Sequence, residues 1–143
     1  MRLTPLRSEW RWPMAALLAE VAAVHIALVP AHLREAPYAG VLFIALSAAS
    51  LTLCVVMIVR DHPLAWAAAG GLTASAIAAY AVSRSIGLPL MADDIGDWVS
   101  PLGIGALCAE AIALALALSV LSRRRPVAQP AGRRVAPLAT GSA

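Results

Sequence analysis

Four apolar stretches, each about as long as a bilayer is thick, constrain this chain more than any other feature of its sequence. They cover residues 13–31, 38–59, 63–86 and 101–121. A helix needs about 20 mostly apolar residues to cross roughly 30 Å of hydrocarbon. Pro13, Pro63 and Pro101 stand where a first helical turn would begin. The sequence therefore predicts an all-α fold, a polytopic membrane protein built as a bundle of four transmembrane helices.

The composition indicates a bilayer rather than water as the solvent. Of the 143 residues, 61% are hydrophobic and only 13% are charged, whereas a soluble domain is about half apolar and about a quarter charged. A body of this size could not enclose so much apolar surface in water. The eleven arginines cluster at the ends of the apolar stretches. We therefore expect lipid as the main partner, other membrane protein subunits as further candidates, and no nucleic acid.

The arginines predict the orientation in the membrane. Only Arg34 and Arg84 lie near one face of the predicted bundle. The other nine lie near the opposite face: Arg2, Arg7, Arg11, Arg60, Arg123, Arg124, Arg125, Arg133 and Arg134. The positive-inside rule therefore places both termini in the cytoplasm of a bacterial plasma membrane and the 87–100 connection outside. Four tryptophans fall near the predicted interfaces, where amphipathic rings prefer to lie: Trp10, Trp12, Trp66 and Trp98.

The apolar stretches divide the chain into three parts. Residues 1–12 are predicted to be a cytoplasmic N-terminus, 13–121 the transmembrane domain and 122–143 a disordered cytoplasmic tail, because such Pro-, Ala- and Gly-rich sequence buries too little apolar area to order itself. A cleaved signal peptide is the alternative for the first stretch, since basic residues precede an apolar run that ends in VPA. That run is long for a signal peptide and contains Glu20 and His25, which favours an intact span.

Ionisable residues at membrane depth are the candidates for function, because a charge there is costly unless it is paired or hydrated. Counting inward at about 1.5 Å per residue places His25 and Glu110 at similar depths, roughly 10 to 13 Å below the predicted outer surface. The two could therefore meet across the bundle, an arrangement common both beside metal ligands and in purely structural pairs. Glu20 has no evident partner; it is either protonated or hydrogen-bonded to a side chain such as Thr73 or Ser75.

The segment HIALVPAHLREAP carries two histidines and a glutamate at the end of the first stretch. His25 and His32 are seven residues apart and Glu35 follows three residues later, so all three would share one helical face if the helix continued past Pro30. Pro30 removes a backbone hydrogen bond and favours a kink there. The two histidines lie roughly 10 Å apart along the helix axis, too far to share one metal ion.

Several functional alternatives stay open for this segment. A metal site would use His32 and Glu35, with an outer aspartate or His25 as the third ligand, although the H-E-x-x-H spacing is missing. One alternative is a haem- or metal-handling membrane protein that uses His25 and His32, since four-helix bundles hold cofactors on facing helices. Another is a membrane-embedded metal-dependent hydrolase. Because the sequence shows no G-x-S-x-G, P-loop or Cys-x-x-Cys motif, we expect no catalytic residues and no cofactor.

Arg84 ends an otherwise uncharged stretch beside an aspartate-rich connection. By depth alone it lies within reach of four carboxylates: Glu35, Asp93, Asp94 and Asp97. A bidentate clamp to one of them would hold the first, third and fourth spans together, whereas the simpler interpretation is a side chain that reaches the lipid headgroups. Together the ionisable residues define a predicted polar cluster that faces outward: His25, His32, Glu35, Arg84, Asp97 and Glu110.

Two segments, HLREAPYAGVLF and SRSIGLPL, resemble motifs of small four-helix integral membrane proteins of actinobacteria and similar bacteria. The matching positions, within residues 20–115, are His25, His32, Glu35, Pro37, Gly40, Phe43, Ser83, Arg84, Gly87, Leu88, Pro89 and Glu110. The connection before the fourth stretch departs from the family pattern, with Met91 where a longer Gly/Pro/Glu segment is often found. The resemblance implies a four-helix architecture and no particular activity.

The function expected from these features is that of a non-enzymatic membrane component. It is either an accessory subunit of a larger complex or a small transporter or sensor. In each case the outward-facing polar cluster would carry the function, because ionisable side chains are retained at membrane depth mainly where they act.

Overall fold

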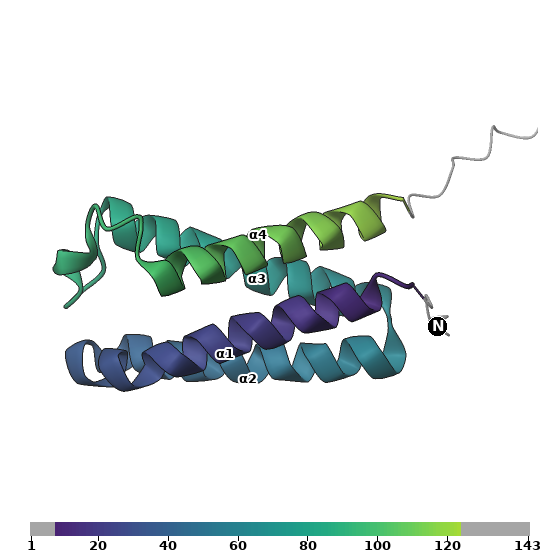
Figure 1. The fold of residues 1–143 in the computed structure, drawn as a ribbon, viewed down its shortest axis with the longest axis horizontal. Helices are drawn as coiled ribbons and strands as arrows, with labels where there is room; N and C mark the ends of the chain where they lie inside the picture. Colours follow the sequence, from purple (N-terminus) through teal and green to yellow (C-terminus); the bar gives the residue numbers. More distant parts are fainter. Residues whose placement is uncertain (1–7, 124–143) are drawn as a thin grey trace, which may run out of the picture.

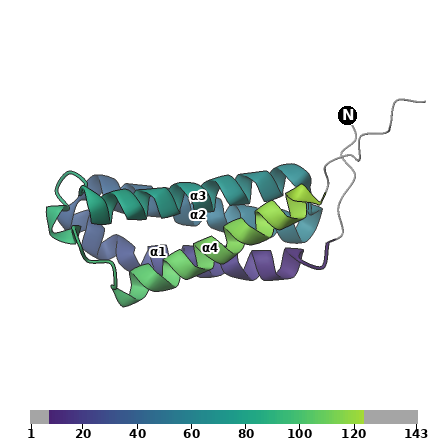
Figure 2. The same cartoon turned by 90° about the horizontal axis from the view of Figure 1, so that it is seen from above.

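Proline opens three of the four long helices of the protein. The computed structural model describes residues 8–123, which form α1 (Arg11–Glu35), α2 (Pro37–Arg60), α3 (Pro63–Ser85), a short 3-10 helix η1 (Ala92–Asp94) and α4 (Pro101–Ser122). A proline fits the first helical turn because its missing N–H would have no partner there. Figures 1 and 2 show the long helices side by side in a bundle. The predicted all-α four-helix fold is confirmed.

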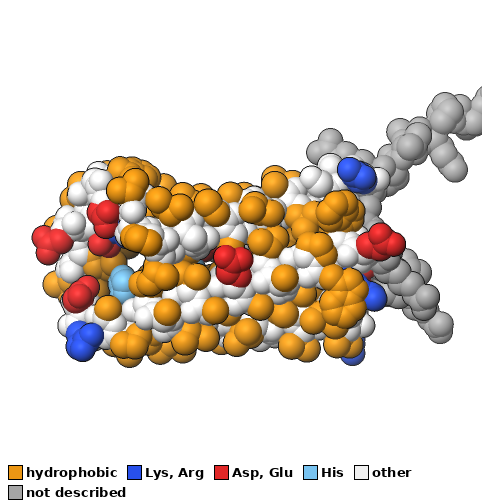
Figure 3. Space-filling view, viewed as in Figure 1, with side chains coloured by type: hydrophobic (Ala, Val, Ile, Leu, Met, Phe, Trp, Pro, Cys, Tyr) orange, Lys and Arg blue, Asp and Glu red, His pale blue; other side chains and the backbone are white. Residues whose placement is uncertain are grey.

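All four long helices, of 22 to 25 residues each, are long and apolar enough to cross a membrane. Their outward-facing side chains are largely apolar; on α2 they include Val41, Leu42, Leu51, Val55 and Val59. Figure 3 shows one face of this surface, on which hydrophobic side chains cover the length of the bundle, most charged ones gather at its two ends and one acidic side chain lies midway. These are the features of an integral membrane protein.

The first helix extends beyond the apolar stretch that predicted it. It continues through Pro30 to Glu35, because a membrane-spanning helix tolerates the loss of the single backbone hydrogen bond that proline removes. One buried residue, Ala36, joins α1 to α2. At this tight turn a Cβ atom added to Gly40 would lie 2.8 Å from the backbone nitrogen of Leu33. The absence of a side chain at Gly40 therefore lets the two helices approach closely.

The bundle is built from two helical hairpins. The α1 helix packs mainly on α2, and α3 mainly on α4, while α1 and α4 make most of the contact between the hairpins. Small residues allow the close approach of α3 to α4: a Cβ atom on Gly70 would lie 3.1 Å from that of Ala117. Apolar side chains from all four helices form the main core: Met14, Leu18, Met57, Trp66, Ala69, Ala113 and Ala117.

The two ends of the bundle differ in structure. We call the end that carries the 86–100 connection the loop end, and the end where α1 begins and α4 finishes the terminal end. Three tryptophans expected at interfaces are about half exposed, at 54% (Trp10), 55% (Trp12) and 46% (Trp98). The fourth, Trp66, is fully buried instead. Most of the predicted disordered tail, residues 124–143, and residues 1–7 lie outside the described part of the chain.

Candidate functional site

His25 and Glu110 face each other inside the bundle, across the contact between α1 and α4. The His25 Nε2 and Glu110 Oε1 atoms are 3.7 Å apart, and the two residues are only 6% and 2% exposed. Depth counted from the sequence indicated this juxtaposition. The distance is too long for a hydrogen bond, and Oε1 has no hydrogen-bond partner among the described residues. A small movement of α1 toward α4 would bring the pair into hydrogen-bond contact.

The tautomer of His25 follows from its backbone contact. Its Nδ1 atom lies 2.8 Å from the carbonyl oxygen of Val21, which can only accept, so Nδ1 carries a hydrogen and donates it. Nε2 is then the ring atom that can take up a proton, and it is the atom nearest the Glu110 carboxyl. One proton held between Nε2 and the carboxyl leaves the pair without net charge, which is the state that an apolar interior favours.

Phe43 of α2 packs against two imidazole rings of α1. Its ring centroid lies 5.0 Å from that of His25, with the rings nearly perpendicular, and 4.6 Å from that of His32. The His32 Nδ1 atom contacts the carbonyl oxygen of Leu28 at 2.9 Å, as expected for an unbroken helix. The sequence reasoning assigned Phe43 no role in the site. The available signal was that it is the only phenylalanine of the chain.

Arg84 is clamped, but by the connection that follows its own helix. Its Nη1 atom is 2.6 Å from Asp94 Oδ1, Ser83 Oγ donates to Asp94 Oδ2 over 3.1 Å, and the guanidinium lies 5.0 Å from the centroid of the Tyr80 ring. Of the four carboxylates within predicted reach, the structure selects Asp94. The ion pair is made by Nη1 alone, while Nε has no partner among the described residues, so it is not bidentate. The clamp closes the 86–100 connection onto α3, so the expectation that it ties three spans together is wrong.

The connection at the loop end is held by backbone contacts as well. Gly87 and Gly96 have φ angles of 80° and 85°, a region that glycine adopts without steric cost. The Gly96 N–H donates to the carbonyl oxygen of Arg84 over 2.9 Å. The hydroxyl of Tyr38, in the first turn of α2, donates to the carbonyl oxygen of Pro89 over 2.6 Å. The connection is therefore fastened to both α2 and α3.

The remaining members of the predicted polar cluster stay apart from these contacts. Glu35 and Asp97 are exposed, and neither forms an ion pair with another described residue. Within residues 8–123, no three His, Cys, Asp or Glu side chains are grouped so that they could hold a metal ion. His32 and Glu35 thus have no third ligand beside them in this part of the chain. The predicted cluster separates into a buried pair and a clamp at the loop end.

At the terminal end, Asp61 is a buried residue that the sequence reasoning missed. It is 1% exposed, and its carboxylate accepts hydrogen bonds from the backbone N–H of Ser8 and, over 2.7 Å, from Trp66 Nε1. The next residue, His62, caps α3, because its Nδ1 atom accepts from the N–H of Leu64 over 3.1 Å. The available signal was a polar Arg-Asp-His segment directly before a helix that opens with proline.

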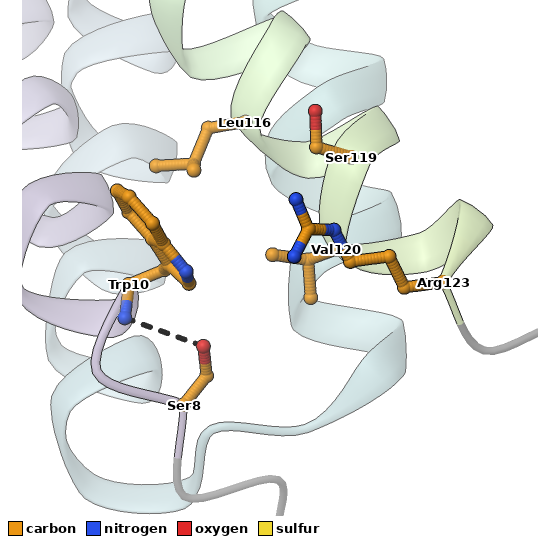
Figure 4. A pocket seen from close by; sticks show the side chains of 6 residues that line it. All are labelled: Ser8, Trp10, Leu116, Ser119, Val120 and Arg123. Atoms are coloured by element: carbon orange, nitrogen blue, oxygen red, sulfur yellow. Dashed lines mark hydrogen bonds between the residues drawn. The ribbon is translucent and has the colours of Figure 1, made fainter.

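A cavity of about 380 Å³ also lies at the terminal end, between the start of α1 and the last turns of α4. Figure 4 shows its lining, with the Trp10 indole and the Arg123 guanidinium on opposite sides of the hollow. The lining residues are Ser8, Trp10, Leu116, Ser119, Val120 and Arg123. The chain therefore has polar groups at three places: the buried pair, the loop end and this cavity.

Comparisons with known proteins found no relative for this chain. No protein-family model matches it. No curated protein and no solved structure matches it either.

Proposed function

We propose that the protein is a non-enzymatic membrane component whose helix packing responds to the protonation of the His25–Glu110 pair. It would act as a proton-responsive sensor or as an accessory subunit. The observation that carries this function is the position of the pair: a buried carboxyl and a buried imidazole face each other at the contact between the two hairpins. An imidazole whose charge changes near neutral pH is suited to switch such a contact.

The number of protons on the pair determines the charge at this contact. With one proton the pair is neutral, whereas with none or with two it carries a net charge of one in an apolar interior, where uncompensated charge is expensive. The α1 and α4 helices make most of the contact between the hairpins. A net charge there favours separation of the hairpins or entry of water, and this couples proton binding to helix packing.

His32 is a second ionisable ring on α1, between the pair and the loop end. It is partly exposed, and its ring packs on the same Phe43 ring as that of His25. We infer exchange with the compartment that the loop end faces. The distribution of arginines supports an outward-facing loop end and cytoplasmic termini in a bacterial plasma membrane. We propose membership of the small four-helix actinobacterial group from the resemblance of the HLREAPYAGVLF and SRSIGLPL segments alone.

The test is a pH titration of the distance between the hairpins. Cys54 and Cys108 are first replaced by alanine, and spin labels are attached to cysteines introduced at the exposed positions Arg34 and Leu102. Pulsed electron paramagnetic resonance of the protein in lipid nanodiscs then reports the distance between α1 and α4. We expect the distance distribution to shift between about pH 5 and pH 8. The double variant His25→Gln, Glu110→Gln should abolish the shift, because neither amide can exchange a proton at this contact.

The matched control is Glu20→Gln, which removes an exposed carboxyl from α1 and should leave the shift intact. Infrared absorption of the carboxyl C=O bond, compared between the parent protein and Glu110→Gln, identifies the proton on Glu110 directly. The proposal is contradicted by a parent protein whose distance distribution is constant over this pH range. A pH response that survives the double variant contradicts it equally.

A further inference from the structure

The cavity at the terminal end has one apolar wall and several polar groups. Leu116 and Val120 of α4 supply the apolar wall. The polar groups come from both ends of the described chain: Ser8, Trp10, Ser119 and Arg123 (Figure 4). Its volume of about 380 Å³ lies within the range of small-molecule sites, roughly 300 to 1,000 Å³. The cavity therefore suits a ligand that has both a polar and an apolar part.

The Arg123 guanidinium and the Ser8 hydroxyl both have hydrogens to donate and no acceptor within residues 8–123. The Arg123 guanidinium forms no ion pair with any described residue. The Ser8 Oγ atom accepts a hydrogen bond from the backbone N–H of Trp10 over 3.2 Å. The hydroxyl hydrogen of Ser8 is therefore free to donate. The Ser119 hydroxyl, by contrast, already donates to the carbonyl oxygen of Ala115 over 2.7 Å. A fixed positive charge and a free hydroxyl thus face the hollow.

We propose that this cavity binds the phosphate of an anionic phospholipid headgroup. A guanidinium binds phosphate oxygens through charge-assisted bonds that are often bidentate, and the Ser8 hydroxyl adds a further donor. None of the lining residues is acidic, and Glu9 does not line the cavity although it is adjacent in sequence. The apolar wall of Leu116 and Val120 favours a lipid over free phosphate, because it would contact the glycerol and the first acyl carbons.

The position of the cavity agrees with the level of lipid headgroups. Trp10 and Trp12 are about half exposed at this end, and tryptophan side chains are enriched where the hydrocarbon meets the headgroups. On α4, the exposed side chain of Ile112 lies one turn before Leu116 on the same helix face and continues the apolar surface toward the middle of the membrane. Acyl chains can follow this surface while the phosphate occupies the cavity. The site is independent of the buried histidine–glutamate pair.

Native mass spectrometry of the 143-residue chain tests the proposal. Protein purified in mild detergent is mixed with phosphatidylglycerol or with phosphatidylcholine, and the fraction that retains one lipid is measured. We expect preferential retention of phosphatidylglycerol. Arg123→Gln should lower its retention about tenfold, the effect of losing one charge-assisted hydrogen bond. Ser8→Ala should lower it less, by about threefold, since a neutral donor contributes less. Circular dichroism verifies that both variants keep their helices.

The matched control is Arg60→Gln, which removes an exposed positive charge at the same end of the bundle but outside the cavity. This variant should retain phosphatidylglycerol like the parent protein. Inorganic phosphate at millimolar concentration distinguishes the two sources of phosphate and should not displace the lipid. Four results would each overturn the proposal: equal retention by Arg123→Gln and the parent protein, equal losses for the two arginine variants, equal retention of both lipids, or displacement by inorganic phosphate.

Discussion

Replacing Asp61 should loosen the terminal end of the bundle, because its side chain joins the segment before α1 to the start of α3. Asp61 is 1% exposed, and its carboxylate accepts hydrogen bonds from the Ser8 N–H and the Trp66 indole. Asp61→Ala leaves both donors without an acceptor. Water has little access to this site, so the cost of both lost bonds should appear in the free energy of unfolding.

The magnitude follows from the two bonds and the backbone. A hydrogen bond to a charged acceptor contributes about 1.5 to 3 kcal/mol, so the loss of two predicts about 3 to 6 kcal/mol. The φ angle of Asp61 is 33°, and in this left-handed region alanine costs about 1 kcal/mol more than glycine. Asp61→Gly should therefore destabilise the protein less than Asp61→Ala. Asp61→Asn should destabilise it least, because the amide oxygen keeps one acceptor.

The assay is a titration of the protein in mixed micelles with sodium dodecyl sulfate, followed by circular dichroism, which gives the free energy of unfolding. Trp66→Phe removes the indole donor and should cost less on the Asp61→Ala background, where the acceptor is already gone, than in the parent protein, as expected for coupled sites. The smaller ring adds a similar packing cost on both backgrounds, because Trp66 is fully buried. Asp93→Asn, at an exposed position, is the control and should change stability by about 0.5 kcal/mol or less. An Asp61→Ala protein that unfolds like the parent, or a glycine variant weaker than the alanine variant, would refute the reasoning.

Three further perturbations test other parts of the fold. Gly40→Ala should destabilise the protein by about 1 to 3 kcal/mol in the same titration, since its Cβ atom would lie 2.8 Å from a backbone nitrogen of α1. Arg84→Ala should speed hydrogen exchange in the connection before α4, and Arg84→Lys should restore protection only in part, because an ammonium keeps the ion pair with Asp94 but not the planar stacking on Tyr80. A reporter fused after Ala143 should be cytoplasmic and one inserted between Asp94 and Ile95 external; two reporters on one side would mean a miscounted span.

The depth of each residue in the membrane could be predicted from the sequence. Helices that cross a slab of fixed thickness place their residues at levels set by the rise per residue, and this reasoning brought His25 and Glu110 together. The partner of Arg84 could not be predicted in the same way, because a short connection follows its own backbone angles. Positive φ angles at Gly87 and Gly96 turn the chain so that Asp94, rather than another carboxylate, meets the guanidinium.

Mutual burial of polar groups was the second feature that hydropathy could not predict. A polar residue between two apolar stretches is ordinarily solvated, and a tryptophan near the end of a span ordinarily lies at the interface. Asp61 and Trp66 depart from both rules because each satisfies the other, through the hydrogen bond from the indole to the carboxylate. Such a pair cannot be predicted from hydropathy, because the contact depends on the rotation of α3 about its axis, which is set by helix packing.

The division of the bundle into two hairpins has a consequence for its biogenesis. Each hairpin satisfies its backbone hydrogen bonds within its own helices, so α1–α2 and α3–α4 can enter the bilayer as separate units and associate afterwards. His25 belongs to the first hairpin and Glu110 to the second. Newly inserted hairpins therefore each carry one member of the pair without its partner, and mutual neutralisation of these two groups favours correct association over dispersal in the lipid.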